Sequence, residues 1–154
     1  MVGAAVLLNV EWPASTSRAM TNVIAVDGDT LRTSGERVRL YGIDAPEYDQ
    51  TCRDDTGRSW PCGRAAKERL ASLVARGSVA CSTQGHDRYG RTLAICSAID
   101  VEDIADVLVR EGYAVDYRRY SFRYSAGALA ARLAGRGIWN GTFEQPEAFH
   151  HRRH

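Results

Sequence analysis

Apolar residues alternate with polar ones in several short runs in the first half of the chain, a pattern typical of half-buried β-strands. In one run Val38 and Leu40 alternate with polar side chains, so one face of the strand is apolar and the other carries Arg39. The runs are separated by the turn-forming sequences DGD and SG, which predicts a three-stranded meander. The three predicted strands are Asn22–Val26, Leu31–Thr33 and Glu36–Ile43.

Helical spacing of apolar residues begins after this meander. Between residues 63 and 76, Ala66, Leu70 and Leu73 recur every three or four positions, and Gly77 stands where a helix would end. Two further strands, Val79–Ser82 and Thr92–Ser97, are joined by a loop with the sequence DRYGR. Residues 101–109 and 126–133 again have helical spacing and each precedes a glycine, so they predict a second and a third helix.

This order of elements is that of a five-stranded Greek-key barrel of the OB type. The predicted fold class is therefore mainly β with α (α+β), with about three helices. We expect this domain to span residues 21–149. It would follow a flexible N-terminal leader or trimmed export segment at residues 1–20 and precede a disordered, basic His/Arg tail at residues 150–154.

The charge balance narrows the classes of protein to consider. The 154 residues include 20 Lys+Arg and 19 Asp+Glu, a net charge of +1, which argues against a generally polybasic nucleic-acid-binding protein. No apolar run approaches the ~18 residues of a membrane-spanning helix, so we expect no transmembrane segment. The apolar stretch Val2–Val10 has no preceding Lys or Arg, and it is either a degenerate export segment or a disordered leader.

Four cysteines permit three disulfide pairings. Cys52 and Cys62 bracket a polar loop, and Cys81 and Cys96 lie almost symmetrically about Tyr89-Gly90, where a hairpin would place them opposite each other. We therefore predict the disulfides Cys52–Cys62 and Cys81–Cys96, and with them an extracytoplasmic location, periplasmic or secreted. The alternative is a cytosolic protein with four buried free thiols.

Acidic residues cluster at two turns: Asp27 and Asp29 in DGDT, and Asp44 and Glu47 in GIDAPE. If the second and third strands pair, these turns meet at one end of the sheet. Carboxyl groups held close together need a hard cation or arginines to neutralise them, and Ca²⁺ or Mg²⁺ prefers such oxygen ligands. DGDT alone is more typical of a simple turn than of a metal site.

Two arginines extend this interpretation. Arg39 lies on the polar face of its strand, and Arg91 lies in the glycine-containing loop after Tyr89. A guanidinium group matches phosphate oxygens bidentately and stays charged throughout a reaction. Acidic residues for a metal, a further glutamate and two arginines are together the groups that phosphodiester hydrolysis requires.

Four motifs in this order resemble the staphylococcal (micrococcal) nuclease family, also called thermonucleases, in its Gram-negative bacterial form. The resemblance spans residues 23–149 and implies a calcium-dependent, sugar-non-specific endonuclease on an OB barrel, which cleaves DNA and RNA to 3′-phosphate and 5′-hydroxyl ends. The matching motifs are VDGDT (residues 26–30), VRLYGIDAPE (38–47), DRYGR (87–91) and GRGIW (135–139).

The resemblance implies a role for each matching residue. Asp29 and Asp44 match the calcium-binding carboxylates, Ala45 the residue that supplies a main-chain carbonyl, and Asp27 an acid that acts through water. Glu47 matches the glutamate assigned as general base. Arg39 and Arg91 match the two arginines that hold the phosphate.

Further residues are expected to bind the substrate. Arg88 and Tyr89 match positions that contact a phosphate, whereas Tyr117 and Tyr120 lie near the family's substrate-lining tyrosines, with Tyr117 one residue out of register. The alternative for this stretch is a partly buried tyrosine cluster with solvated arginines. We expect a monomer that binds single-stranded nucleic acid preferentially and needs no protein partner. The competing function is a non-catalytic OB-fold nucleic-acid-binding module.

Overall fold

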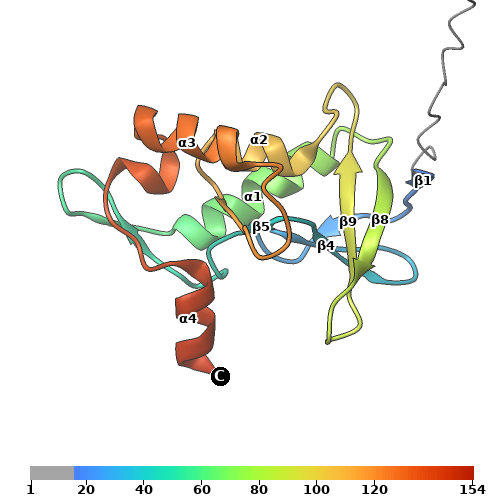
Figure 1. Cartoon of the computed structure of the whole chain (residues 1–154), viewed down its shortest axis with the longest axis horizontal. Helices are drawn as coiled ribbons and strands as arrows, with labels where there is room; N and C mark the ends of the chain where they lie inside the picture. Colours follow the sequence, from blue (N-terminus) through green and yellow to red (C-terminus); the bar gives the residue numbers. More distant parts are fainter. Residues whose placement is uncertain (1–15) are drawn as a thin grey trace, which may run out of the picture.

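A curled six-stranded sheet forms the centre of the computed structural model, which describes residues 16–154 (Figure 1). All neighbouring strands run antiparallel except β4 and β9, which run parallel. The five strands predicted from the sequence are confirmed, but the third ends at Leu40, with Ile43 in a separate strand, and the fourth extends to His86. The fold is α+β with a sheet of the OB type. From edge to edge the strands are β1 (Arg18–Ala19), β8 (Ala80–His86), β9 (Thr92–Ser97), β4 (Arg37–Leu40), β3 (Thr30–Arg32) and β2 (Ile24–Ala25).

Strand pairing between β3 and β4 fixes the position of the first acidic turn. In β4, Val38 and Leu40 are buried, as their alternation predicts, and Arg39 lies opposite Thr30 of β3. The main-chain N–H of Leu40 donates to the carbonyl oxygen of Asp29 over 2.8 Å. The turn before β3 is therefore held directly beside the strand that carries Arg39.

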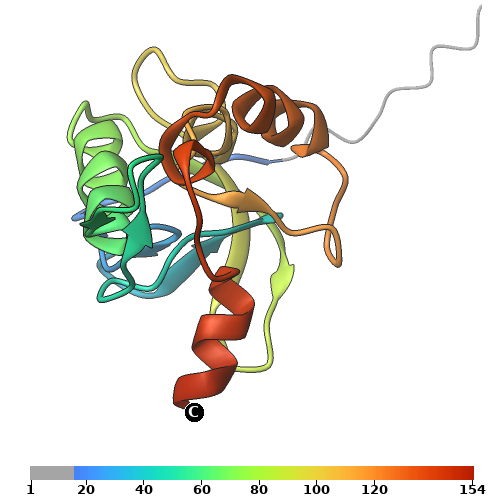
Figure 2. The same ribbon diagram turned by 90° about the vertical axis from the view of Figure 1, so that its left-hand side faces the viewer.

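Three helices pack together beside the curled sheet (Figures 1 and 2). Helix α1 (Cys62–Val74) contacts β2, α2 (Ile104–Arg110) contacts both β9 and α1, and α3 (Ser125–Ala134) packs on α2. The side chain of Asp103 caps α2 by accepting hydrogen bonds from two main-chain N–H groups, and Gly135 ends α3 in the left-handed conformation, with φ 63°. These are the three helices that the apolar spacing predicts.

The two predicted disulfides are confirmed. Cys81 and Cys96 are cross-strand partners in β8 and β9, so the hairpin places them opposite each other as expected. The Cys52–Cys62 disulfide links a small hairpin to the first residue of α1. A second apolar cluster surrounds this disulfide, apart from the main core between sheet and helices. The hairpin strands are β6 (Cys52–Arg53) and β7 (Ser59–Trp60), and the cluster also contains Val115, Ile138, Trp139 and Phe143.

The structure departs from the expected boundaries at both ends of the domain. Residues 1–15 of the expected leader lie outside the described residues, but Arg18–Ala19, near its end, form β1 and pair with β8. The expected tail at residues 150–154 is helical up to Arg153, because it continues a fourth helix, α4 (Pro146–Arg153). A short 3₁₀ helix, η1 (Gly137–Asn140), lies between α3 and α4. The helix count is therefore higher than the expected three.

Helix α4 forms for reasons other than apolar periodicity. Pro146 occupies its first turn, where a missing N–H removes no helical hydrogen bond. Glu147 in the first turn, and the His and Arg residues in the last, have the charges that the helix dipole favours at each end. In both views α4 projects from the other helices at the end of the molecule where the β8–β9 hairpin turns (Figures 1 and 2). Over residues 16–154, no helix is long and apolar enough to cross a membrane.

Candidate active site

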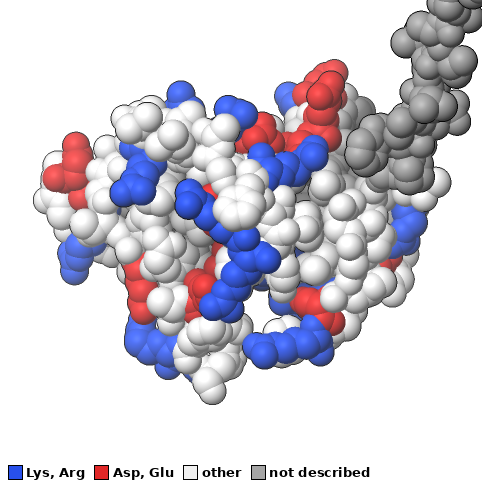
Figure 3. Space-filling model, viewed as in Figure 1, with Lys and Arg blue, Asp and Glu red and all other residues white. Residues whose placement is uncertain are grey.

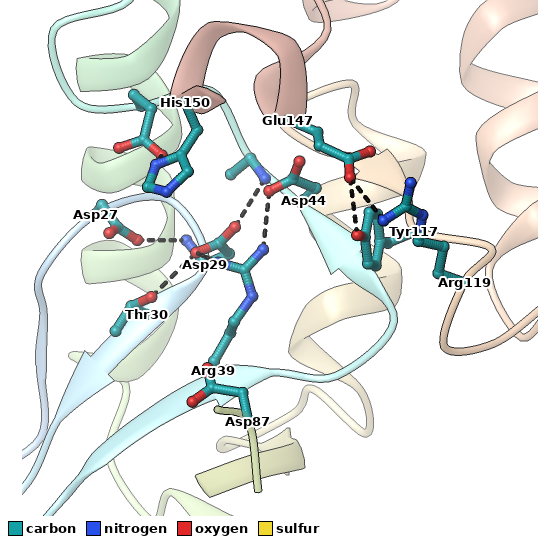
Figure 4. Close-up of polar contacts among 12 residues, drawn as sticks. Asp27, Asp29, Thr30, Arg39, Asp44, Asp87, Tyr117, Arg119, Glu147 and His150 are labelled. Carbon is teal, nitrogen blue, oxygen red and sulfur yellow. Dashed lines mark hydrogen bonds and ion pairs between the residues drawn. The ribbon is translucent and has the colours of Figure 1, made fainter. Parts of the chain in front are cut away.

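Two buried aspartates and one arginine form the centre of the site (Figure 4). Arg39 donates from Nη2 to Oδ1 of Asp44 over 2.8 Å, and from Nη1 to Oδ1 of Asp29 over 3.3 Å. The other carboxylate oxygen of Asp29 accepts a hydrogen bond of 2.9 Å from the main-chain N–H of Ala45. Asp44 is in turn held by strand pairing, since β5 (Ile43–Asp44) pairs with β10 (Val115–Asp116). The two acidic turns thus lie together, joined by Arg39.

The site carries more negative charge than Arg39 neutralises. Asp27 lies beside Asp29 and accepts a hydrogen bond from its main-chain N–H over 3.1 Å. Burial, followed by the charge of Asp29, raises the pKa of Asp27 from 3.8 to about 7. The same two causes, in the same order, raise the pKa of Asp44 to about 7 in spite of its contact with Arg39. A further positive charge at this place would relieve the repulsion.

The carboxylate oxygens of these residues determine which kind of metal ion the site could bind. Within residues 16–154, no three His, Cys, Asp or Glu side chains are arranged to hold a metal ion on their own. Carboxylate oxygens are nevertheless the donors that converge here, and hard cations such as Ca²⁺ take carboxylates, main-chain carbonyls and water together. Asp29 and Asp44 are therefore the residues of this site that could hold a hard cation.

Glu47 is positioned by its main chain, near the start of α1. Its N–H donates to Oε1 of Gln50 over 3.3 Å, and its carbonyl oxygen accepts from the main-chain N–H of Gln50 over 2.8 Å. Gly63, the second residue of α1, permits the close approach of the two segments, because a Cβ at Gly63 would lie 1.7 Å from the carbonyl oxygen of Glu47. The segment that carries Glu47 is thus fixed by backbone contacts, whereas its side chain is partly exposed.

The β8–β9 turn brings a second arginine to the site. Asp87 organises this turn: its carboxylate accepts from the main-chain N–H groups of Tyr89 and Arg91, and from Nε of Arg91 over 2.6 Å. Tyr89 is exposed, and the guanidinium groups of Arg88 and Arg91 both lie over its ring, 5.0 and 5.5 Å from the centroid. Two cations and an aromatic ring therefore face solvent at the tip of the hairpin.

Tyr117 and Tyr120 line another part of the cavity, and Tyr41 contacts Tyr120. The rings of Tyr117 and Tyr120 meet edge to face at 5.1 Å, and the ring of Tyr120 stacks on Tyr41 at 6.0 Å. The hydroxyl group of Tyr41 also donates to the main-chain carbonyl of Tyr120 over 2.6 Å. Tyr41 itself does not line the cavity, and these contacts hold Tyr120 in place.

These groups surround one open cavity of about 620 Å³. Figure 3 shows the surface hollowed between α4 and the β8–β9 hairpin, with basic and acidic side chains on its borders. Asp29 and Ala45 do not line the cavity: Asp29 bonds to the wall residue Arg39, and the main-chain N–H of Ala45 bonds to Asp29. The expected site residues that line the cavity are Asp27, Arg39, Asp44, Glu47, Arg88, Tyr89, Arg91, Tyr117 and Tyr120.

Comparison with known proteins identifies the family that has this site. The sequence model described as "Staphylococcal nuclease homologue" matches residues 37–141, which include most of the cavity wall. This chain belongs to the staphylococcal nuclease family. The family expected from the four sequence motifs is thereby confirmed.

Relatives in the staphylococcal nuclease family come from several bacteria. The "Micrococcal nuclease" of Shigella flexneri is 34% identical over 158 residues, covering 90% of this chain and 83% of that protein. An "Uncharacterized endonuclease" of Escherichia coli O157:H7 is 32% identical, covering 88% of this chain and 86% of its own. The "Succinoglycan biosynthesis protein ExoI" of Rhizobium meliloti (strain 1021) is 38% identical over 79% of this chain. This chain spans 63% of the length of ExoI.

Helix α4 contributes cavity residues that the sequence analysis did not assign. Glu147 accepts from the hydroxyl group of Tyr117 and pairs with Arg119, each over 3.2 Å, and Nδ1 of His150 lies 3.1 Å from Oε1 of Glu47. The family match ends at residue 141, before this helix begins. From the sequence alone we expect a disordered tail at residues 150–154; Pro146 and the charges at the two ends of the segment are compatible with a helix, but no local signal predicts where it lies.

Proposed function

We propose that the protein is a calcium-dependent, sugar-non-specific endonuclease that hydrolyses DNA and RNA to 3′-phosphate and 5′-hydroxyl ends. One observation carries this proposal. Asp44 lines the cavity together with Glu47 and Arg91, and the buried Asp29 lies behind the wall, joined to Asp44 through Arg39. Membership of the staphylococcal nuclease family supports the nuclease class of this reaction.

The chain's own residues divide the reaction between them. Arg39 and Arg91 bind the phosphate oxygens, on which negative charge grows as water attacks phosphorus. Each of these guanidinium groups is held by an aspartate and retains further N–H donors for the substrate. Glu47 orients the attacking water and accepts its proton, a contribution of ~10²- to 10⁴-fold in rate.

Hydrolysis forms one bond to phosphorus and breaks another. The water oxygen forms a bond to phosphorus, the bond from phosphorus to the 5′ oxygen breaks, and that oxygen takes up a proton to leave a 5′-hydroxyl group. Asp29, Asp44 and the main-chain carbonyl of Ala45 would hold Ca²⁺, with Asp27 acting through water. The bound ion would stabilise the phosphoryl charge as a Lewis acid.

The residues that line the open cavity also favour one form of nucleic acid as substrate. Arg88 and Tyr89 at the hairpin tip contact a neighbouring phosphate, and the partly exposed Tyr117 and Tyr120 provide faces on which unpaired bases stack. We therefore propose that single-stranded DNA and RNA are preferred. The protein would act as a monomer and, because of its two disulfides, outside the cytoplasm.

Cleavage of single-stranded DNA by purified protein in millimolar Ca²⁺ tests this function. We expect cleavage to stop with EDTA, and to fall by ~10²-fold or more in Glu47→Gln and Arg39→Ala. Matched controls are Glu68→Gln on α1 and Arg58→Ala in the disulfide loop, both exposed and outside the cavity wall. Controls should keep the wild-type rate. Binding of the DNA without cleavage would instead identify a non-catalytic nucleic-acid-binding module.

A further inference from the structure

The C-terminal helix α4 brings a histidine into contact with the proposed general base. Nδ1 of His150 lies 3.1 Å from Oε1 of Glu47, although the two residues are 103 positions apart. An ionised carboxylate can only accept, so the imidazole Nδ1 carries the hydrogen in this contact. Figure 4 shows His150 pointing from α4 towards the acidic centre of the site. No other described side chain is recorded as bonding to the carboxylate of Glu47.

Several contacts hold α4 in this place. Near its start, Glu147 bonds to the hydroxyl group of Tyr117 and to Arg119, each over 3.2 Å. Near its end, Arg153 pairs with Asp49, two residues after Glu47 in the chain. The position of His150 is therefore fixed from both ends of the helix.

A buried glutamine connects α4 to the main chain of Glu47. Gln50 is 1% exposed; its Nε2 donates to the carbonyl oxygen of Glu144 over 2.7 Å, and its Oε1 accepts from the N–H of Glu47. Glu144 lies immediately before α4. Gln50 thus links the backbone of Glu47 to the segment just before α4, the helix that carries His150.

We propose that His150 is a positioning residue that orients the Glu47 carboxylate for catalysis. Its Nδ1–H engages Oε1, which leaves Oε2 to accept the proton of the attacking water. Glu47 has a long side chain that is 40% exposed, and without this contact it would sample several rotamers. A carboxylate held in one orientation reacts at a higher rate than one that must first be ordered. This inference rests on the proposed function, because it needs Glu47 to act in the reaction.

Three substitutions at one position separate orientation from other roles. His150→Ala removes the contact, His150→Asn places an amide donor near the position of Nδ1, and His150→Phe keeps a ring without a donor. We expect kcat on single-stranded DNA to fall about 10-fold in the Ala and Phe variants, with KM unchanged, and to recover substantially in the Asn variant. The control is Arg152→Gln on the same helix, which removes the exposed pair with Glu144 and the contact with the ring of Phe149, and should retain full activity.

A double-mutant comparison shows whether His150 acts through Glu47. In a Glu47→Gln background, His150→Ala should cause no further loss, because the group that it positions is already disabled. A purely structural role would lower the rate by the same factor in both backgrounds. Circular dichroism of each variant verifies that α4 and the fold are retained.

The remaining outcomes each overturn the inference in a recognisable way. An unchanged kcat in His150→Ala would mean that the contact has no role, and a raised KM alone would make His150 a substrate-binding group. A higher rate would mean that α4 obstructs the site. If wild-type protein fails to cleave, or Glu47→Gln cleaves at the wild-type rate, the proposed function itself fails and this inference falls with it.

Discussion

Gly63 provides a test of how the fold positions Glu47. In Gly63→Ala the new Cβ would lie 1.7 Å from the carbonyl oxygen of Glu47 and 2.8 Å from that of Tyr48. A comfortable carbon–oxygen contact is about 3.3 Å, so α1 and the Glu47 segment must separate by about 1.5 Å. Both contacts are with backbone atoms, and a change of side-chain rotamer therefore cannot relieve them.

Gly63→Ala has two opposite effects on the free energy of unfolding, whereas its effect on activity has one direction. Overpacking costs about 1–3 kcal/mol, whereas alanine gains about 1 kcal/mol over glycine in a helix. The free energy of unfolding should therefore fall by about 0–2 kcal/mol. Displacing a catalytic group by about 1 Å can lower the rate by about 10²-fold, so we expect activity to be lost from protein that remains folded.

The assay compares Gly63→Ala with Gly35→Ala in the Ser34-Gly35 turn. Gly35 is a matched control because its φ is not positive and a Cβ there meets no atom within 4 Å. Cleavage of single-stranded DNA in Ca²⁺ gives kcat, and thermal unfolding gives Tm, which changes by about 2–4 °C per kcal/mol in a chain of this size. If Gly63→Ala matched Gly35→Ala in kcat, the packing of α1 against the Glu47 segment would not position the site.

Three further predictions concern charge and disulfides. Arg39→Ala leaves two buried aspartates unpaired and should lower the free energy of unfolding of the metal-free protein by about 3–5 kcal/mol, measured in urea. With Ca²⁺ present the loss should be smaller. An equal loss with and without Ca²⁺ would contradict this reasoning. The folded-state pKa values of Asp27 and Asp44, about 7, lie above the unfolded value of 3.8. Their contribution to the stability of the metal-free protein therefore decreases as pH rises from about 4 to 7. Tm measured in EDTA should show this slope, and the double Asn variant should lose it; an identical slope in that variant would refute the assignment. Replacing Cys81 and Cys96 by Ser should cost about 3 kcal/mol in urea unfolding, and an unchanged midpoint would contradict a stabilising role.

Strand and helix patterns predict the part of the fold that is built from local signals. The alternation of Val38 and Leu40 with Arg39 predicts the buried and the polar face of β4, and the spacing in 63–76 predicts α1. The pairing of β5 with β10 carries no comparable signal, because each strand has two residues and its partner is distant in the chain. Such pairing follows from tertiary packing, which local patterns do not contain.

The residues of the site likewise differ in whether the sequence predicts that they lie together. The acidic turns and Arg39 belong to neighbouring strands, so their approach follows from a predicted meander. The contact of His150 with Glu47 depends on the direction in which the chain returns after α3, and nothing in the spacing of either residue indicates it. Sequence therefore predicts the residue types at the site, whereas the contribution of α4 becomes evident only from the fold.

A calcium titration of cleavage tests the central claim most directly. The single-turnover rate on single-stranded DNA should be absent in EDTA, rise to saturation with Ca²⁺ in the wild-type protein, and require a higher concentration for half-saturation in Asp44→Asn. Equal rates in EDTA and in Ca²⁺, or the same half-saturation in both proteins, would contradict a catalytic calcium site at Asp29 and Asp44.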